Sequence, residues 1–121
     1  MLLHTITSLT EQQMVDRYLP ITVEFFKFIL TEIFPGGFAP PIQMVEEYSA
    51  KAGFTLTRRQ SLQPHHARTL DLWTAVLRAH ESEAIEIQSE EVHERYVKYL
   101  TGCASLFRTG YIDVNQFSPA C

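Results

Sequence analysis

The sequence predicts an α/β protein in which three short strands are separated by helices. An apolar run at residues 2–6, a run with β-branched residues at 54–62 and an alternating run at 111–117 have the length and composition of strands. Between them, apolar residues recur at helical spacing, and turn residues separate the segments. The 121 residues contain no internal repeat or linker, so we expect one domain.

The first predicted strand, Leu2-Leu3-His4-Thr5-Ile6, has the apolar composition of a strand that is buried on both faces and paired on both edges. A helix is expected next, from about Val23 to Phe34, with Thr22 as its cap and Pro35-Gly36-Gly37 as its end. Its apolar residues cover more surface than one buried face requires. They are Phe25, Phe26, Phe28, Ile29, Leu30, Ile33 and Phe34.

A second helix is predicted from Ile42 to about Ala52, after Pro40-Pro41 and before Gly53. The residues expected to face inward are Met44, Val45 and Tyr48. The strand at residues 54–62 follows. Its C-terminal half is expected near an edge of the sheet, because Arg58 and Gln60 share a face with apolar residues.

We expect residues 63–66 to form a loop and a helix to run from about Ala67 to His80, with Leu70, Trp73 and Leu77 on one face. Ser89, followed by two glutamates, predicts the start of a last helix that reaches about Thr109 and ends at Gly110. Its packing residues are predicted to be Val92, Tyr96, Tyr99, Leu100, Cys103 and Phe107. The strand at 111–117 is then expected to end before Pro119.

Composition and charge exclude several classes of protein. Ten basic against fourteen acidic residues, with no basic cluster longer than Arg58-Arg59, exclude an electrostatic footprint for nucleic acid. The sequence has no apolar run long enough for a transmembrane helix and no start typical of a signal peptide, so a cytoplasmic location is predicted. Cys103 and Cys121 cannot form a disulfide framework, and both are expected to be reduced.

General catalytic motifs are absent. There is no dinucleotide-binding or phosphate loop, no pair of cysteines with zinc spacing and no hydrolase elbow. His80-Glu81 begins like a zinc-protease helix, but Ala84 stands where the second histidine ligand would be. His65-His66 is interpreted as a loop pair rather than a metal site, and His93 as part of a solvated helix face.

Two side chains and one surface leave alternatives open. His4 lies within an apolar strand, where it is either a hydrogen-bonded core histidine or a catalytic one. Cys103 on its helix is either a small apolar residue or a nucleophile. The surface made by Phe25, Phe26, Phe28 and Ile29 is by default core, although its width suggests an acyl channel.

Five motifs in a familiar order carry a resemblance. They are Leu2-Leu3-His4-Thr5-Ile6, Phe34-Pro35-Gly36-Gly37, Leu62-Gln63-Pro64-His65-His66-Ala67-Arg68-Thr69-Leu70 with Trp73, Tyr99-Leu100-Thr101-Gly102-Cys103-Ala104, and Gly110-Tyr111-Ile112-Asp113-Val114-Asn115-Gln116-Phe117. From Met1 to about Phe117 the chain resembles the C-terminal part of the cyclopropane-fatty-acid synthase family, most closely its mycolic acid cyclopropane synthase branch.

The resemblance implies the C-terminal portion of a doubly wound class I methyltransferase fold. Residues 1–121 would be a partial domain without the N-terminal half that binds S-adenosylmethionine. Residues 2–6 would be the fifth strand and residues 54–62 the sixth. Residues 111–117 would form an antiparallel seventh strand inserted between them. The helices between residues 62 and 110 would help to cover a lipid site, and the helix at 23–34 would line an acyl tunnel.

The implied reaction is methyl transfer from S-adenosylmethionine to a cis alkene of a long acyl chain, followed by proton loss from a carbocation. Such a site must exclude water and place a base near the new methyl group. In the family the base is a bound bicarbonate. The matching residues are His4, through its side chain, and Ile6, through its backbone, with Cys103 nearby. The substrate would contact Phe25, Phe26, Phe28 and Ile29.

The resemblance also implies one departure and several partners. His66 stands where the family has a tyrosine that orients the anion, and imidazole is shorter and titrates near neutral pH. The expected partners are a long-chain acyl substrate, free or attached to a carrier protein, and a separate N-terminal half. The first hypothesis is a fragment that is inactive alone. The alternative is a stand-alone module that binds acyl chains or docks onto a methyltransferase.

Overall fold

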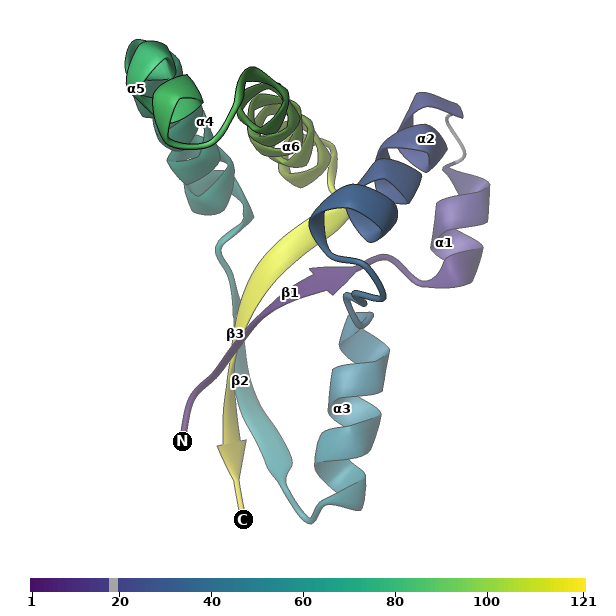
Figure 1. The fold of residues 1–121 in the computed structure, drawn as a ribbon. Coiled ribbons are helices and arrows are strands. Elements are labelled where there is room, and N and C mark those ends of the chain that lie inside the picture. Colours follow the sequence, from purple (N-terminus) through teal and green to yellow (C-terminus); the bar gives the residue numbers. More distant parts are fainter. Residues whose placement is uncertain (18–19) are drawn as a thin grey trace.

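The computed structural model describes residues 1–17 and 20–121 and contains a sheet flanked by helices (Figure 1). The strands are β1 (Leu3–Ser8), β2 (Thr55–Ser61) and β3 (Ile112–Ala120). The helices are α1 (Glu11–Asp16), α2 (Pro20–Phe28), the π-helical η1 (Ile29–Ile33), α3 (Ile42–Lys51), α4 (Gln63–Ala79), α5 (Glu81–Ile87) and α6 (Glu90–Thr109). None of the helices within the described residues is long and apolar enough to cross a membrane.

The sheet has the order β1-β3-β2, and β3 is antiparallel to both of its neighbours. The last strand of the chain therefore lies between two strands that are parallel to each other. This confirms the arrangement that the family resemblance implied. Leu3 of β1 pairs with Phe117, and Ser8 pairs with Ile112 at the other end.

Helices α4 and α6 pack against each other and against β3, and they form the core with one face of the sheet (Figure 1). An ion pair between Asp71 and Arg108 and a hydrogen bond from the Gln63 amide to the Phe107 carbonyl join the two helices. Burial of apolar surface is the main stabilising term here. The buried cluster is Ala67, Leu70, Leu100, Cys103, Ala104, Leu106, Phe107, Tyr111, Ile112 and Val114.

β1 was predicted to be buried on both faces, and this is wrong for the described residues. Leu3 and Ile6 are 39% and 41% exposed. In the sheet that the structure describes, β1 is an edge strand with β3 as its one neighbour. An edge strand keeps unpaired backbone groups along its outer side, and this property matters for the site.

The ends of α6 are as predicted. The Ser89 hydroxyl accepts a hydrogen bond from the backbone N–H of Val92 at 3.1 Å, and Gly110 has a φ of 83°. Glycine is favoured at this left-handed position because it has no Cβ. The two glutamates in the first turn complement the helix dipole.

The start of α4 was predicted four residues too late. The helix begins at Gln63, with Pro64 in its first turn, so His65 and His66 are helical and not part of a loop. Proline is favoured at the first helical positions because its missing N–H has no intrahelical partner there. On the predicted inner face Leu70 is buried, but Trp73 is 54% exposed.

The helix predicted at residues 23–34 begins earlier and changes its winding. α2 starts at Pro20, so Thr22 lies inside the helix and not at its cap, and the last turn is the π-helix η1. The prediction for α3 was close, since the helix ends at Lys51 with Gly53 at a φ of 87°. Tyr48 was predicted to face inward and is instead 61% exposed.

Two features of the last half were not predicted. α5 forms a short helix before Ser89, and β3 continues through Pro119 to Ala120. Pro119 is tolerated because β1 pairs with β3 only as far as Phe117, so the missing N–H of Pro119 removes no bond to β1.

Candidate functional site

The outer edge of β1 carries the residues that the resemblance placed at the reaction centre. His4, Ile6 and Ser8 alternate along the strand, so they share one face and their N–H groups point to one edge. The N–H of Ser8 donates outward, to the Pro40 carbonyl at 3.1 Å. The N–H of Ile6 therefore points to the same edge, away from β3. In this direction it could donate a hydrogen bond to a bound anion, which is the backbone role predicted for Ile6.

His66 is close enough to His4 for the charge of His4 to affect its pKa. His66 lies in the first turn of α4, and its ring packs against that of Phe107 in a T-shaped arrangement, with centroids 4.7 Å apart. Burial, and then the charge of His4 nearby, lower the pKa of His66 below its ordinary value of 6.5. His66 is therefore neutral at neutral pH. The Gln116 amide nitrogen lies 3.2 Å from Nδ1 of His4, which is exposed.

Cys103 has the environment of a core residue. It is buried on α6 within the main apolar cluster. Burial raises the pKa of its thiol to about 12, so the sulfur is protonated at neutral pH. A nucleophilic cysteine requires a lowered pKa, so this environment favours the interpretation of Cys103 as a small apolar residue.

An apolar cavity of about 470 Å³ opens next to the end of β1. Ser8 and Ala39 lie at its floor, joined by a hydrogen bond from the Ser8 hydroxyl to the Ala39 carbonyl at 2.7 Å. Phe34 and Phe38, 52% and 72% exposed, stand at its rim. Its other lining residues are Met14, Phe26, Ile29, Leu30 and Gly37. Its size and apolar lining are typical of a pocket for a small molecule or an acyl chain.

The four predicted substrate contacts divide into two groups. Phe26 and Ile29 line the apolar cavity. Phe28 is 7% exposed beneath the Lys98 ammonium, which lies 4.0 Å from the ring centroid. Phe25 packs against Gly102 of α6. The helix formed by α2 and η1 thus has two apolar sides, because one side faces α6 and the other faces the cavity.

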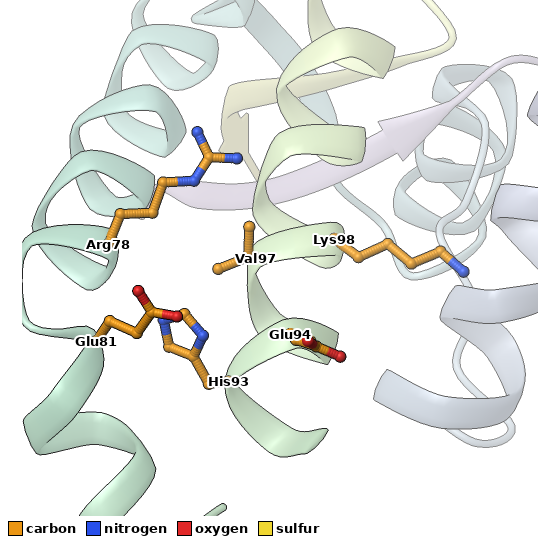
Figure 2. A pocket seen from close by; sticks show the side chains of 6 residues that line it. All are labelled: Arg78, Glu81, His93, Glu94, Val97 and Lys98. Carbon is orange, nitrogen blue, oxygen red and sulfur yellow. The ribbon is translucent and has the colours of Figure 1, made fainter. Parts of the chain in front are cut away.

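A second cavity, of about 430 Å³, lies between α4, α5 and α6 (Figure 2). Its lining is mostly charged: Arg78, Glu81, His93, Glu94, Val97 and Lys98. His93 was predicted to be solvated but is 7% exposed, and its Nε2 is enclosed without a hydrogen-bond partner among the described residues. Figure 2 shows Lys98 directed away from this cavity, toward α2. A ligand in this cavity could not reach Nε2 of His93, because that atom is enclosed. The charged cavity is therefore a weaker candidate for the functional site than the apolar one.

Sequence reasoning missed the floor and rim of the apolar cavity. Ser8, Phe38 and Ala39 are separated in sequence, and only the pairing of β1 with the segment at Pro40-Pro41 brings them together. A partial signal existed in Phe34 and Phe38, which flank Pro35-Gly36-Gly37. Within the described residues no group of three or more His, Cys, Asp or Glu side chains could hold a metal ion.

The strand order and the cavity at the carboxyl end of β1 define the class of protein. An antiparallel strand between two parallel ones, with a cavity where a parallel strand ends, is the arrangement expected for the C-terminal portion of a class I methyltransferase fold.

Comparison with known proteins defines the family. Residues 1–117 match the family described as mycolic acid cyclopropane synthetase, so the chain belongs to that family. It is 73% identical over 123 residues to cyclopropane mycolic acid synthase MmaA2 of Mycobacterium tuberculosis, which covers 99% of this chain and 43% of the relative. It is 62% identical to methoxy mycolic acid synthase MmaA3 of the same organism. The chain thus spans less than half the length of these relatives.

Solved structures show the same likeness. The cyclopropane synthase MmaA2 from Mycobacterium tuberculosis superposes with a TM-score of 0.94 at 71% identity, over 99% of this chain and 43% of that one. The mycolic acid cyclopropane synthase CmaA1 complexed with SAH and CTAB superposes with a TM-score of 0.92 at 61% identity, over 98% of this chain and 43% of that one.

Proposed function

We propose that this chain provides the acyl-binding part of an S-adenosylmethionine-dependent methyltransferase that acts on a cis alkene of a long acyl chain. The observation that carries the proposal is the apolar cavity, which ends at Ser8 on the same edge of β1 as Ile6 and His4. At about 3.3 Å per residue, His4 lies about 13 Å along the strand from Ser8. An acyl chain in the cavity would therefore lead toward the two histidines.

The residues of this chain would protect and stabilise a cationic acyl chain. S-adenosylmethionine supplies an electrophilic methyl group when bound. The apolar lining excludes the water that would otherwise add to the cation. Phe26 and Phe34 present aromatic rings to the cavity, and the face of such a ring attracts positive charge.

The polar groups near β1 fit an anion such as bicarbonate, which supplies a base for proton removal when bound. The outward N–H of Ile6 and the exposed imidazole of His4 are hydrogen-bond donors of the kind that holds a carboxylate-like anion. We propose that His66 takes the orienting part that a tyrosine has in the family. A neutral imidazole can donate one hydrogen bond, so its lowered pKa is compatible with this role.

We further propose that the S-adenosylmethionine site belongs to the part of the relatives that this chain does not span, and that the chain is inactive alone. The chain covers 43% of its relatives and contains no glycine-rich nucleotide loop. A separate N-terminal half would then be the catalytic partner. The acyl substrate would be delivered free or attached to a carrier protein.

The test combines binding with reconstitution. Displacement of dansylated undecanoic acid by long-chain fatty acids should be saturable, and calorimetric titration with S-adenosylmethionine should show no binding. Mixing the chain with the N-terminal half of MmaA2 should yield cyclopropanated lipid. Absence of saturable acyl binding, or tight binding of S-adenosylmethionine by the chain alone, would contradict the proposal.

A second candidate is a binding module without catalysis, since the lining of the apolar cavity comes from this chain's own residues. It predicts the same acyl binding but no lipid product in the mixing experiment. His66→Tyr separates the two candidates further. For a methyltransferase part, this change toward the family residue should raise the yield of the reconstituted enzyme, whereas a module would show no product with either residue.

A further inference from the structure

Gly102 lies in the middle of α6, where the helical backbone conformation does not require a glycine. It is not among the glycines with positive φ, and a glycine inside a helix costs about 1 kcal/mol relative to alanine. A Cβ built on Gly102 would lie 2.0 Å from Cε2 and 2.2 Å from Cζ of Phe25. The ring of Phe25 thus occupies the volume that a side chain at residue 102 would need.

A second contact joins α2 to α6 near Phe25 and Gly102. One turn further along each helix, the Lys98 ammonium lies 4.0 Å from the centroid of the buried Phe28 ring. The rings of Phe25 and Phe28 are themselves 5.8 Å apart and tilted by 42°. A cavity of about 270 Å³ remains beside them, lined by Glu24, Phe25, Lys98, Thr101 and Gly102. The Phe25 ring is the group that a side chain at residue 102 would meet, so the size of residue 102 limits how closely this part of α2 can approach α6.

The other side of the same helix forms a wall of the apolar cavity, through Phe26 and then Ile29 and Leu30 of η1. π-helical turns are frequent at functional sites, and η1 widens the helix where it meets the cavity. A helix moves as a rigid body over a few residues. A displacement at Phe25 is therefore transmitted to Phe26 and Ile29.

We infer that Gly102 is a specificity-determining residue: by admitting the Phe25 ring, it sets the depth of α2 on α6 and thereby the width of the acyl cavity. The inference rests on the proposed acyl-binding function and adds a residue that does not touch the ligand. Gly102 is a positioning residue in this sense, since it acts through Phe25 and α2.

Gly102→Ala is the direct test, with binding of straight-chain fatty acids from decanoic to eicosanoic acid measured by displacement of dansylated undecanoic acid. Affinity for the longer acids should fall roughly tenfold, and the preferred chain length should change. In the double variant Gly102→Ala/Phe25→Leu, which makes room for the new methyl group, affinity should return to within about threefold of the original chain. Ser105→Ala, an exposed change on the same helix, is the matched control and should leave binding unchanged.

Equal chain-length profiles for Gly102→Ala and the original chain would overturn the inference, as would a double variant that binds no better than Gly102→Ala. If the original chain binds no fatty acid, the proposed function fails instead. The contact between Phe25 and residue 102 is then tested by urea unfolding of Gly102→Ala, Phe25→Leu and the double variant. A double variant less destabilised than the sum of the single changes supports the ring-on-glycine contact, and additive changes contradict it.

Discussion

Two cavities of nearly equal volume differ in what surrounds them. The apolar cavity of about 470 Å³ is built from a strand end, a π-helical turn and the loop after it. The charged cavity of about 430 Å³ is a gap between neighbouring helices, lined by side chains of both charge signs (Figure 2). Volume alone does not separate them. What separates them is position, because of these two cavities only the apolar one reaches β1, at Ser8.

The largest expected effect comes from placing a carboxylate in the apolar cavity, and a carboxylate in the charged cavity is the control. Ile29→Asp places a carboxylate in the apolar lining, where removal from water is costly, and should weaken fatty acid binding by at least about tenfold. Val97→Asp, in the charged cavity, should leave that binding unchanged. Displacement of dansylated undecanoic acid measures both. Equal losses for the two variants would mean that the cavities do not differ in function.

The enclosed nitrogen of His93, in the charged cavity, predicts a gain, in this case a gain in stability. An unpaired buried polar atom destabilises the fold, so His93→Leu should raise the free energy of unfolding by about 1 kcal/mol. Urea unfolding of the chain is the measurement. The exposed His65→Leu is the control and should change stability by less than about 0.5 kcal/mol. A clear loss of stability in His93→Leu would show that the imidazole has a partner.

His66, whose pKa is lowered by burial and by the charge of His4, predicts that stability depends on pH. Its folded-state pKa is lowered, so the unfolded chain binds the proton more readily. Stability should therefore be fully present above pH of about 6.5 and decline as pH falls from there toward the lowered folded-state value. His66→Phe should flatten this decline. Urea midpoints across that range are compared with those of His65→Phe, and parallel curves for the original chain and His66→Phe would contradict the prediction.

The smallest effect is expected at Lys98, which lines the charged cavity but contacts the Phe28 ring. Lys98→Met keeps the aliphatic stem and removes the cation over the ring, at a cost of about 0.5 kcal/mol in unfolding free energy. Lys27→Met, an exposed change on α2, serves as the comparison and should have no measurable effect. A larger loss at Lys27 than at Lys98 would contradict the role of the ring contact.

Local signals predicted part of the fold well. Ser89 and Gly110 bound α6 as expected, because capping depends on a few adjacent residues. Pro64 was an available signal for an earlier start of α4 that was not used. His93 could also have been placed in the core, since it lies seven residues before Leu100 on the packing face of α6.

Features that depend on distant partners could not be predicted from the residues alone. Pro119 fits inside β3 only because β1 stops pairing at Phe117. The cavity floor depends on the approach of Ser8 to Ala39, thirty-one residues away along the chain. The strand order itself came from family resemblance, because periodicity does not specify which strand lies in the middle of a sheet.

The register of β1 on β3 also has a practical consequence. Leu3 lies opposite Phe117, and Figure 1 shows both termini at the same end of the sheet. The cavity meets the other end of β1, at Ser8. An affinity tag, a surface anchor or a fused protein attached at either terminus would therefore lie at the end of the sheet opposite Ser8, away from the apolar cavity, in immobilised binding measurements.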